Sequence, residues 1–294
     1  MESKKKIITV ALVAGLAVSA SAAEEHVDRV VGEILGNVAK IKSVDPAAVP
    51  MAFWDFDGTI IHGDISVGLE ENGVKRFKGM IHEGILAGWS PIFKGEEGCR
   101  QFDRDYRRLE EIGRFIAWPF IGQAFAGVKV ADFNRFCAQR VRDVYSKWYF
   151  ASSVAILRRL EAAGVENHIM SGSPELFIKN AAGSIGLSPD RMHGNRLTVD
   201  GEILSTRIEY PVTTGEGKVE LLRRLVTARK SAYAVAAFGD SYRTDGAFLR
   251  YVVLQTLPGG AKGFALMING SSFEPGYDGL FTCVKQAELV SRAE

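Results

Sequence analysis

The strongest constraint on the fold is a regular alternation of strand-like and helix-like segments in the second half of the chain. The short runs 165–170 and 232–238 are typical of strands, and the second is apolar, whereas 152–163 and 218–228 carry apolar residues at helical spacing. An earlier apolar run, 49–54, stops at acidic and glycine residues, as a buried strand does when it delivers a loop. Strands that alternate with helices form βαβ units. We therefore predict an α/β fold with a doubly wound, Rossmann-like parallel sheet.

The segment 64–150 differs from the rest, because it is rich in aromatic residues and arginine and is broken into short helical stretches by Gly and Pro. We expect a helical insert there. The other expected elements are helices at 24–42, 174–185 and 245–250, a hairpin at 196–208 that turns at Asp200-Gly201, and strands near 251–256 and 264–268.

Polar residues follow three of the predicted strands, at 55–59, 171–173 and 240–245. In an open parallel sheet, ligands bind beyond the carboxyl ends of the strands. We therefore expect these three segments to lie on the same rim of the sheet.

The first of them, Asp55-Phe56-Asp57-Gly58-Thr59, brings two carboxylates close together. Like charges at this distance favour a bound cation or a shared proton, and Mg²⁺ is the usual hard cation beside phosphate. Gly58 allows a sharp turn and exposes backbone N–H groups to an anion. A surface turn or a calcium loop has the same residue types, but the apolar residues before Asp55 disfavour a solvated loop.

In Ser171-Gly172-Ser173-Pro174, the hydroxyl of Ser171 and the N–H groups of a helix start favour an anion. Ser173 before Pro174 is also a good N-cap pair, so Ser171 is expected to be the ligand and Ser173 the cap. Lys218 opens a helix, where the helix dipole disfavours positive charge. We therefore expect it to pair with a carboxylate or a phosphate, although a surface lysine has the same appearance.

Asp240 and Asp245 follow the strand at 232–238. Asp240 is a natural metal ligand. Asp245 could orient a metal-bound water, pair with Lys218, or simply be an acid at a helix N-terminus.

These residues resemble the motifs of the haloacid dehalogenase superfamily, and most closely its phosphoserine-phosphatase-like branch, over roughly residues 49–270. In the order of the four motifs, the matching residues are Asp55 and Asp57, Ser171, Lys218, and Asp240 with Asp245. Asp240 and Asp245 lie one residue further apart than in many members. The insert at 64–150 corresponds to the helical cap of that branch.

The resemblance implies a role for each residue. Asp55 would attack phosphorus, and Asp57 would protonate the leaving oxygen and later activate water. The resemblance assigns Mg²⁺ to Asp55, the backbone carbonyl of Asp57, and Asp240, with Asp245 supporting the metal shell. The transferring phosphoryl group would be bound by Gly58, Thr59, Ser171, Gly172 and Lys218.

Asp64 stands where phosphoserine phosphatases carry a Glu that binds the substrate amine. It is therefore a candidate substrate ligand, and the alternative is the N-cap of a cap helix. Several aromatic rings of the insert could contact a quaternary ammonium group or could simply pack the insert. These candidates are Trp89, Phe93, Phe102, Tyr106, Phe115, Trp118, Phe120 and Phe125. Its arginines, which include Arg114, could bind an acidic substrate or form a solvated helix face.

The N-terminus has the pattern of a secretory signal peptide. Lys4, Lys5 and Lys6 precede an apolar run of about a dozen residues, which is well short of the roughly 20 that span a bilayer. The small residues that follow predict cleavage after Ala22 or Ala23. We therefore expect a signal peptide at 1–23, a core at 24–63 and 151–294, and a cap at 64–150, in an exported protein (periplasmic or secreted) without a stable membrane anchor.

Charge and cysteine content exclude some classes of function. The net charge of +1 gives no reason to expect a nucleic-acid partner. The three cysteines, Cys99, Cys137 and Cys283, form no C-x-x-C pair, so a zinc or redox motif is unsupported. They are either free buried thiols or include one disulfide.

Taken together, the sequence predicts an exported, Mg²⁺-dependent phosphomonoester hydrolase that acts through an aspartyl-phosphate on a small phosphorylated metabolite. The substrate could be similar to phosphoserine or phosphocholine, or the enzyme could be general. A phosphotransferase or phosphomutase would use the same residues. A non-catalytic exported binding protein is a further alternative, but it would need neither Asp57 nor Lys218.

Overall fold

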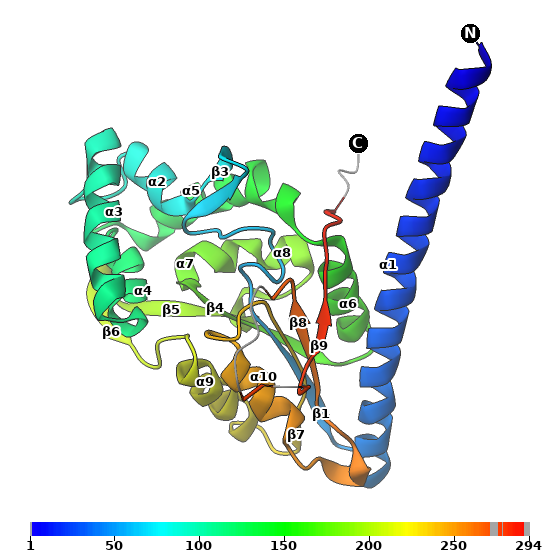
Figure 1. Ribbon diagram of the computed structural model, residues 1–294. Helices are drawn as coiled ribbons and strands as arrows, with labels where there is room; N and C mark the ends of the chain where they lie inside the picture. The colour runs from blue at the N-terminus through cyan, green and yellow to red at the C-terminus, as the bar shows by residue number, and fades with distance from the viewer. Residues whose placement is uncertain (1, 271–275, 278, 291–294) are drawn as a thin grey trace.

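The computed structural model describes residues 2–270, 276–277 and 279–290, with side chains from residue 22 onward. Its centre is a seven-stranded sheet in the order β6-β5-β4-β1-β7-β8-β9, which is parallel except for the antiparallel pair β5–β6 (Figure 1). The strands are β1 (Val49–Trp54), β4 (Glu166–Pro174), β5 (Met192–Asp200), β6 (Ile203–Glu209), β7 (Ala232–Gly239), β8 (Phe264–Ile268) and β9 (Thr282–Val284). The predicted α/β fold is confirmed.

Helices cover both faces of this sheet because its strands are apolar on both sides. Along β1, Ala52 and Trp54 pack into one core, and Met51 and Phe53 pack into the other. The first core lies under α1 (Glu2–Val44) and α6 (Ala151–Ala162), and the second under α9 (Glu216–Thr227) and α10 (Gly246–Val253) (Figure 1).

Helix α1 includes the predicted helix at 24–42 and begins earlier, at Glu2. Its buried residues recur at helical spacing: Val27, Val30, Val31, Ile34, Val38 and Ile41. Full burial of such a side chain contributes about 1.5–3 kcal/mol, so this face fixes the helix on the core. In the part of the chain that the structure describes, no helix combines the length and apolarity needed to cross a membrane.

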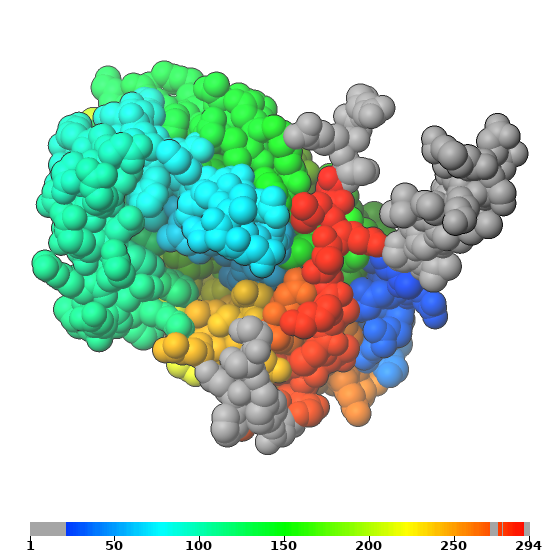
Figure 2. Space-filling model, turned by 45° about the horizontal axis from the view of Figure 1, so that its top comes forward, coloured from blue at the N-terminus to red at the C-terminus, as the bar shows by residue number. Residues whose placement is uncertain are grey.

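The cap segment (residues 64–150) lies between β1 and α6, and it occupies the side of the molecule opposite α1 (Figure 2). It is mostly helical, with α2 (Met80–Leu86), α3 (Gly95–Ile112), α4 (Arg114–Gln123), α5 (Val130–Asp143) and the 3₁₀ turn η1 (Tyr145–Trp148).

The cap segment also contains a hairpin that the sequence analysis missed, β2 (Gly68–Glu71) and β3 (Val74–Lys78). Its strands are short and mostly exposed, so they lack an apolar alternation. The available signal was Asn72-Gly73, where both residues have positive φ, as this hairpin turn requires.

Other boundaries differ from the predictions. The strand expected near 251–256 is wrong, because α10 continues to Val253 and buries Phe248, Leu249 and Val252 at helical spacing. The segment 174–185 is not one helix but α7 (Glu175–Ile178), η2 (Lys179–Ala181) and α8 (Ala182–Ile185). The turn of the β5–β6 hairpin is Gly201-Glu202, one residue later than expected, because Asp200 pairs with Ile203. Strand β9 was not predicted.

Candidate active site

The three predicted polar segments meet at one cavity of about 610 Å³ beyond the carboxyl ends of β1, β4 and β7. Core residues form one part of its lining: Asp55, Asp57, Gly58, Gly172, Ser173, Lys218, Asp240, Ser241 and Thr244. Ser171, Thr59 and Asp245 are fully buried next to these residues and do not line the cavity.

Lys218 lies between two carboxylates. Its Nζ is 2.5 Å from Oδ1 of Asp55 and 2.6 Å from Oδ1 of Asp245. All three side chains are buried. Burial lowers the pKa of Lys218, but the charges of Asp245 and Asp55 outweigh this effect and raise the pKa above its ordinary value. Lys218 therefore stays positive and holds the Asp55 carboxylate in place.

Asp57 is fixed by three donors. Its Oδ1 accepts the N–H of Ile65 at 2.7 Å, and its Oδ2 accepts the hydroxyls of Ser171 at 2.9 Å and Ser173 at 2.8 Å. Burial and the charge of Asp64 raise its pKa to about 7. A carboxyl with this pKa can both donate and accept a proton near neutral pH.

Ser173 is therefore not the helix cap that the sequence analysis expected. The cap residue of α7 is Pro174, and no side chain caps this helix. The hydroxyl of Ser173 donates to Asp57 and accepts a hydrogen bond from Ser66 at 2.7 Å. The signal was the two-residue spacing from Ser171, which places both hydroxyls on one side of β4.

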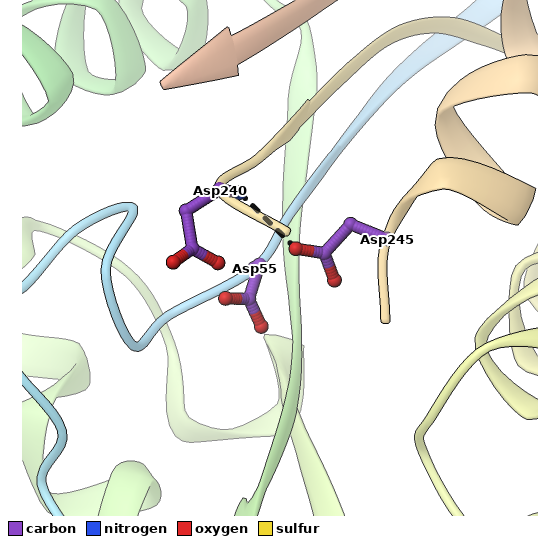
Figure 3. A group of neighbouring side chains, drawn as sticks. All are labelled: Asp55, Asp240 and Asp245. Carbon is purple, nitrogen blue, oxygen red and sulfur yellow. Dashed lines mark hydrogen bonds between the residues drawn. The ribbon is translucent and has the colours of Figure 1, made fainter. Parts of the chain in front are cut away.

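The carboxyl groups of Asp55, Asp240 and Asp245 lie close together, and one oxygen of each is within 4.8 Å of the other two (Figure 3). Burial and the charge of Asp245 raise the pKa of Asp55 to about 8 and that of Asp240 to about 9. Without a further cation, Asp55 and Asp240 therefore retain protons near neutral pH.

Asp245 has less freedom than the other two. Its Oδ2 accepts the N–H groups of Asp240 at 3.1 Å and Ser241 at 3.0 Å, while its Oδ1 accepts from Lys218. Although Asp245 stands at the N-cap of α10, it makes no capping hydrogen bond. It positions Lys218 and the 240–241 loop.

The residues fit a divalent metal ion. Carboxylate oxygens are the ligands that Mg²⁺ prefers, and Asp55 and Asp240 present theirs to the cavity. Gly58 makes this approach possible, because a Cβ on Gly58 would lie 2.2 Å from Oδ2 of Asp240. Its φ of +74° also suits glycine. Asp55 and Asp240 would hold the ion.

Asp64 lines the same cavity. Its Oδ1 accepts the N–H groups of Ser66 at 2.6 Å and Val67 at 3.0 Å, which closes a turn. The N-cap interpretation is wrong, since a turn and then β2 follow Asp64 instead of a helix. Burial raises the pKa of Asp64.

Thr59 does not reach the cavity. Its carbonyl oxygen accepts the Ser153 hydroxyl at 2.7 Å, and its own hydroxyl has no partner among the described residues. Its role as a phosphate ligand stays a prediction.

The cap segment lines the other part of the cavity with Tyr106 and Glu110 of α3 and Trp118 of α4. Trp118 covers Gly172, where a Cβ would lie 2.2 Å from the ring, so only glycine fits beneath it. Of the eight predicted rings, Phe102 stacks on Phe120, Phe93 meets both of them edge-on, and Phe125 stacks on Phe133, as the packing interpretation expected.

The three cysteines are free: Cys99 and Cys137 are buried, and Cys283 is exposed. The structure contains none of the disulfides that the sequence left open.

An α/β sheet with an acidic nucleophile candidate, a buried lysine and clustered aspartates at its carboxyl edge defines a class of hydrolases. The model of a protein family described as haloacid dehalogenase-like hydrolase matches residues 52–250, and the chain belongs to this family. The resemblance drawn from the motifs is confirmed at this level.

Solved structures share the fold. A protein of unknown function from Bordetella pertussis Tohama I aligns with a TM-score of 0.59 and 16% identity, over 81% of this chain and 98% of that one. A conserved, functionally unknown protein from Anaerococcus prevotii aligns with a TM-score of 0.51 and 14% identity, over 80% of this chain and 81% of that one. A phosphoserine phosphatase structure, described as a phospho-aspartyl intermediate analogue, aligns with a TM-score of 0.46 and 14% identity, over 81% and 93%. No curated protein sequence matches the chain.

Proposed function

We propose that this protein is a Mg²⁺-dependent phosphomonoester hydrolase with Asp55 as its nucleophile. The observation that carries the proposal is the convergence of Asp55, Asp57, Lys218 and Asp240 on one cavity. A binding protein would need an anion site, but it would not need a second carboxyl group with a pKa near 7 beside the first.

In the first step, a carboxylate oxygen of Asp55 attacks phosphorus and the bond to the leaving oxygen breaks. Asp57 gives its proton to that oxygen, and an aspartyl-phosphate remains on Asp55. In the second step, the Asp57 carboxylate takes a proton from water, which attacks phosphorus and releases phosphate from Asp55. Ser171, Ser173 and the N–H of Ile65 hold Asp57 in position for both transfers.

Charge compensation completes the site. Lys218 neutralises one of the clustered carboxylates and lies where it can approach a phosphoryl oxygen. Bound Mg²⁺ would supply the remaining positive charge, which keeps Asp55 and Asp240 ionised and stabilises the transferring phosphoryl group.

The test is hydrolysis of p-nitrophenyl phosphate by the purified chain, with Mg²⁺ and with EDTA. Activity should require the metal, and acid-quenched protein should retain covalent phosphate. Asp57→Asn is the informative variant, because p-nitrophenolate is a good leaving group that does not need a proton from Asp57. This variant should form the phosphoenzyme but hydrolyse it slowly. Metal-independent activity, or no covalent phosphate in this variant, would contradict the proposal.

We also propose that the chain is exported and that residues 1–23 are removed. The first buried side chain among the described residues of α1 is Val27, so cleavage after Ala22 or Ala23 would leave the packed face of the helix intact. Mass spectrometry of the N-terminus in cell fractions tests this. An uncleaved N-terminus in the cytoplasmic fraction would contradict it.

A further inference from the structure

The cap-side part of the cavity has a chemistry that narrows the choice of substrate. The cavity is lined there by the rings of Tyr106 and Trp118 and by the carboxyl groups of Glu110 and Asp64. Tyr106 and Trp118 are partly exposed, and Glu110 is exposed. These groups are open to a ligand.

The ionisable side chains that line this cavity are mostly acidic. Among the described residues that line it, Lys218 is the one with a cationic side chain, and its Nζ already contacts two carboxylates. The lining carries five acidic groups: Asp55, Asp57, Asp64, Glu110 and Asp240. A carboxylate or a second phosphate on the substrate would therefore meet no free countercharge in the lining.

The acidic groups on the cap side act on the same ring. Burial raises the pKa of Tyr106, the charges of Glu110 and Asp64 raise it further, and the charge of Arg114 opposes them. Glu110 follows Tyr106 by one turn of α3, and both line the cavity together with Asp64 from the loop after β1.

We infer that this part of the cavity binds a cationic nitrogen. The substrate is then the phosphomonoester of an amino or quaternary ammonium alcohol that has no further anionic group. Aromatic faces attract such cations, and nearby carboxylates add to this attraction. The inference rests on the proposed phosphatase function and specifies the alcohol that is released.

Arg114 is the strongest reason to expect an anionic substrate instead of a cationic one. Its guanidinium carbon lies 5.6 Å from the centre of the Trp118 ring, outside the cavity lining. If Arg114 turned inward, a substrate with a carboxylate would be favoured instead. The experiment therefore includes O-phosphoserine.

The experiment compares kcat/KM for choline phosphate, for its neutral isostere in which carbon replaces nitrogen, and for O-phosphoserine, all with Mg²⁺. Choline phosphate should exceed the isostere by about tenfold or more. Glu110→Gln should remove most of this preference by raising KM for choline phosphate several-fold more than KM for the isostere. Glu111→Gln, the neighbouring exposed acid outside the lining, is the matched control.

Two further variants test the ring and the arginine. Trp118→Phe should keep most of the preference, and Trp118→Leu should reduce it. Equal kcat/KM for choline phosphate and its isostere would overturn the inference. The inference would also be overturned if O-phosphoserine were the best substrate and lost its advantage in Arg114→Gln.

Hydrolysis of p-nitrophenyl phosphate separates the two proposals. Its absence would contradict the phosphatase function itself, whereas its presence without a charge preference would contradict only this inference.

Discussion

The core side and the cap side of the cavity are built differently. On the core side, Asp55, Asp57 and Asp245 accept hydrogen bonds of 2.5–3.1 Å from Lys218, two serine hydroxyls and backbone N–H groups. On the cap side, Glu110 is exposed, and Tyr106 and Trp118 are partly exposed. Groups held by buried partners are preorganised for one chemistry. The cap side can change its residues at little cost in stability, so it is suited to select the substrate.

The largest effect is expected on the core side, from Asp55→Asn. The amide has nearly the same shape but cannot attack phosphorus, so kcat for p-nitrophenyl phosphate should fall by at least about 10⁴-fold. Circular dichroism should show an unchanged fold. A fully active variant would refute the assignment of the nucleophile, and Glu110→Gln, on the cap side, should keep full activity on this substrate.

Lys218→Met tests whether the core side depends on charge compensation. It leaves Asp55 and Asp245 buried without their cation, and loss of one partner of a buried pair costs about 3–5 kcal/mol. Urea unfolding in EDTA should show this loss, and Mg²⁺ should recover part of it. The control is Lys129→Met, because Lys129 is an exposed cap residue whose pair with Glu202 should contribute little. Equal stability of the two variants would contradict the proposed role of Lys218.

Gly172→Ala tests the contact between the two sides. The added methyl group would lie 2.2 Å from the Trp118 ring, so the ring must move, at a cost of about 1–3 kcal/mol. Activity should fall as well, because Gly172 lies between Ser171 and Ser173. Trp118→Leu in the same chain should restore much of the stability, as measured by thermal unfolding. If the double variant were as unstable as Gly172→Ala, the ring would not be the cause.

The core side could be predicted from the sequence because its residues stand at the ends of strands. Strand ends in a parallel sheet share one edge, so the sequence alone predicts that Asp55, Ser171 and Asp240 lie close together. The spacing from Ser171 was a signal for Ser173, but the role of Ser66 could not be predicted, because it depends on a hydrogen bond to a residue more than a hundred positions away.

For the cap side, the sequence predicted which types of residue are present but not which of them line the cavity. Eight aromatic rings of the insert were candidates, but which of them line the cavity depends on how α3 and α4 pack, and periodicity does not specify this. The β2–β3 hairpin was missed for a similar reason, because its strands are short and mostly exposed. Local pattern determines an element when several residues of one face are buried, and in this hairpin only the pair Leu69 and Phe77 packs against the core.

The smallest effect is a dependence of stability on pH to which Asp55 and Asp240 on the core side contribute. In the metal-free protein, burial raises the pKa of Asp55 to about 8 and of Asp240 to about 9, whereas both titrate near 3.8 when unfolded. Near pH 7 the folded chain therefore binds more protons than the unfolded chain. Stability should fall from pH 7 to pH 8, by about 1.4 kcal/mol per pH unit for each extra proton.

Histidine should add only a small slope of opposite sign, because burial lowers the pKa of His168 to about 3 and of His193 to about 4, and unfolded histidine, which titrates near 6.5, is already mostly neutral above pH 7. The measurement is urea unfolding at pH 7 and pH 8 in EDTA and in Mg²⁺. Bound metal should flatten the slope, since it keeps the folded carboxylates ionised. Asp240→Asn should also flatten it without metal, whereas Glu110→Gln should leave it unchanged. Stability in EDTA that is constant or rises over this range would show that the clustered aspartates do not retain their protons, and the contrast between the two sides of the cavity would then lose its electrostatic basis.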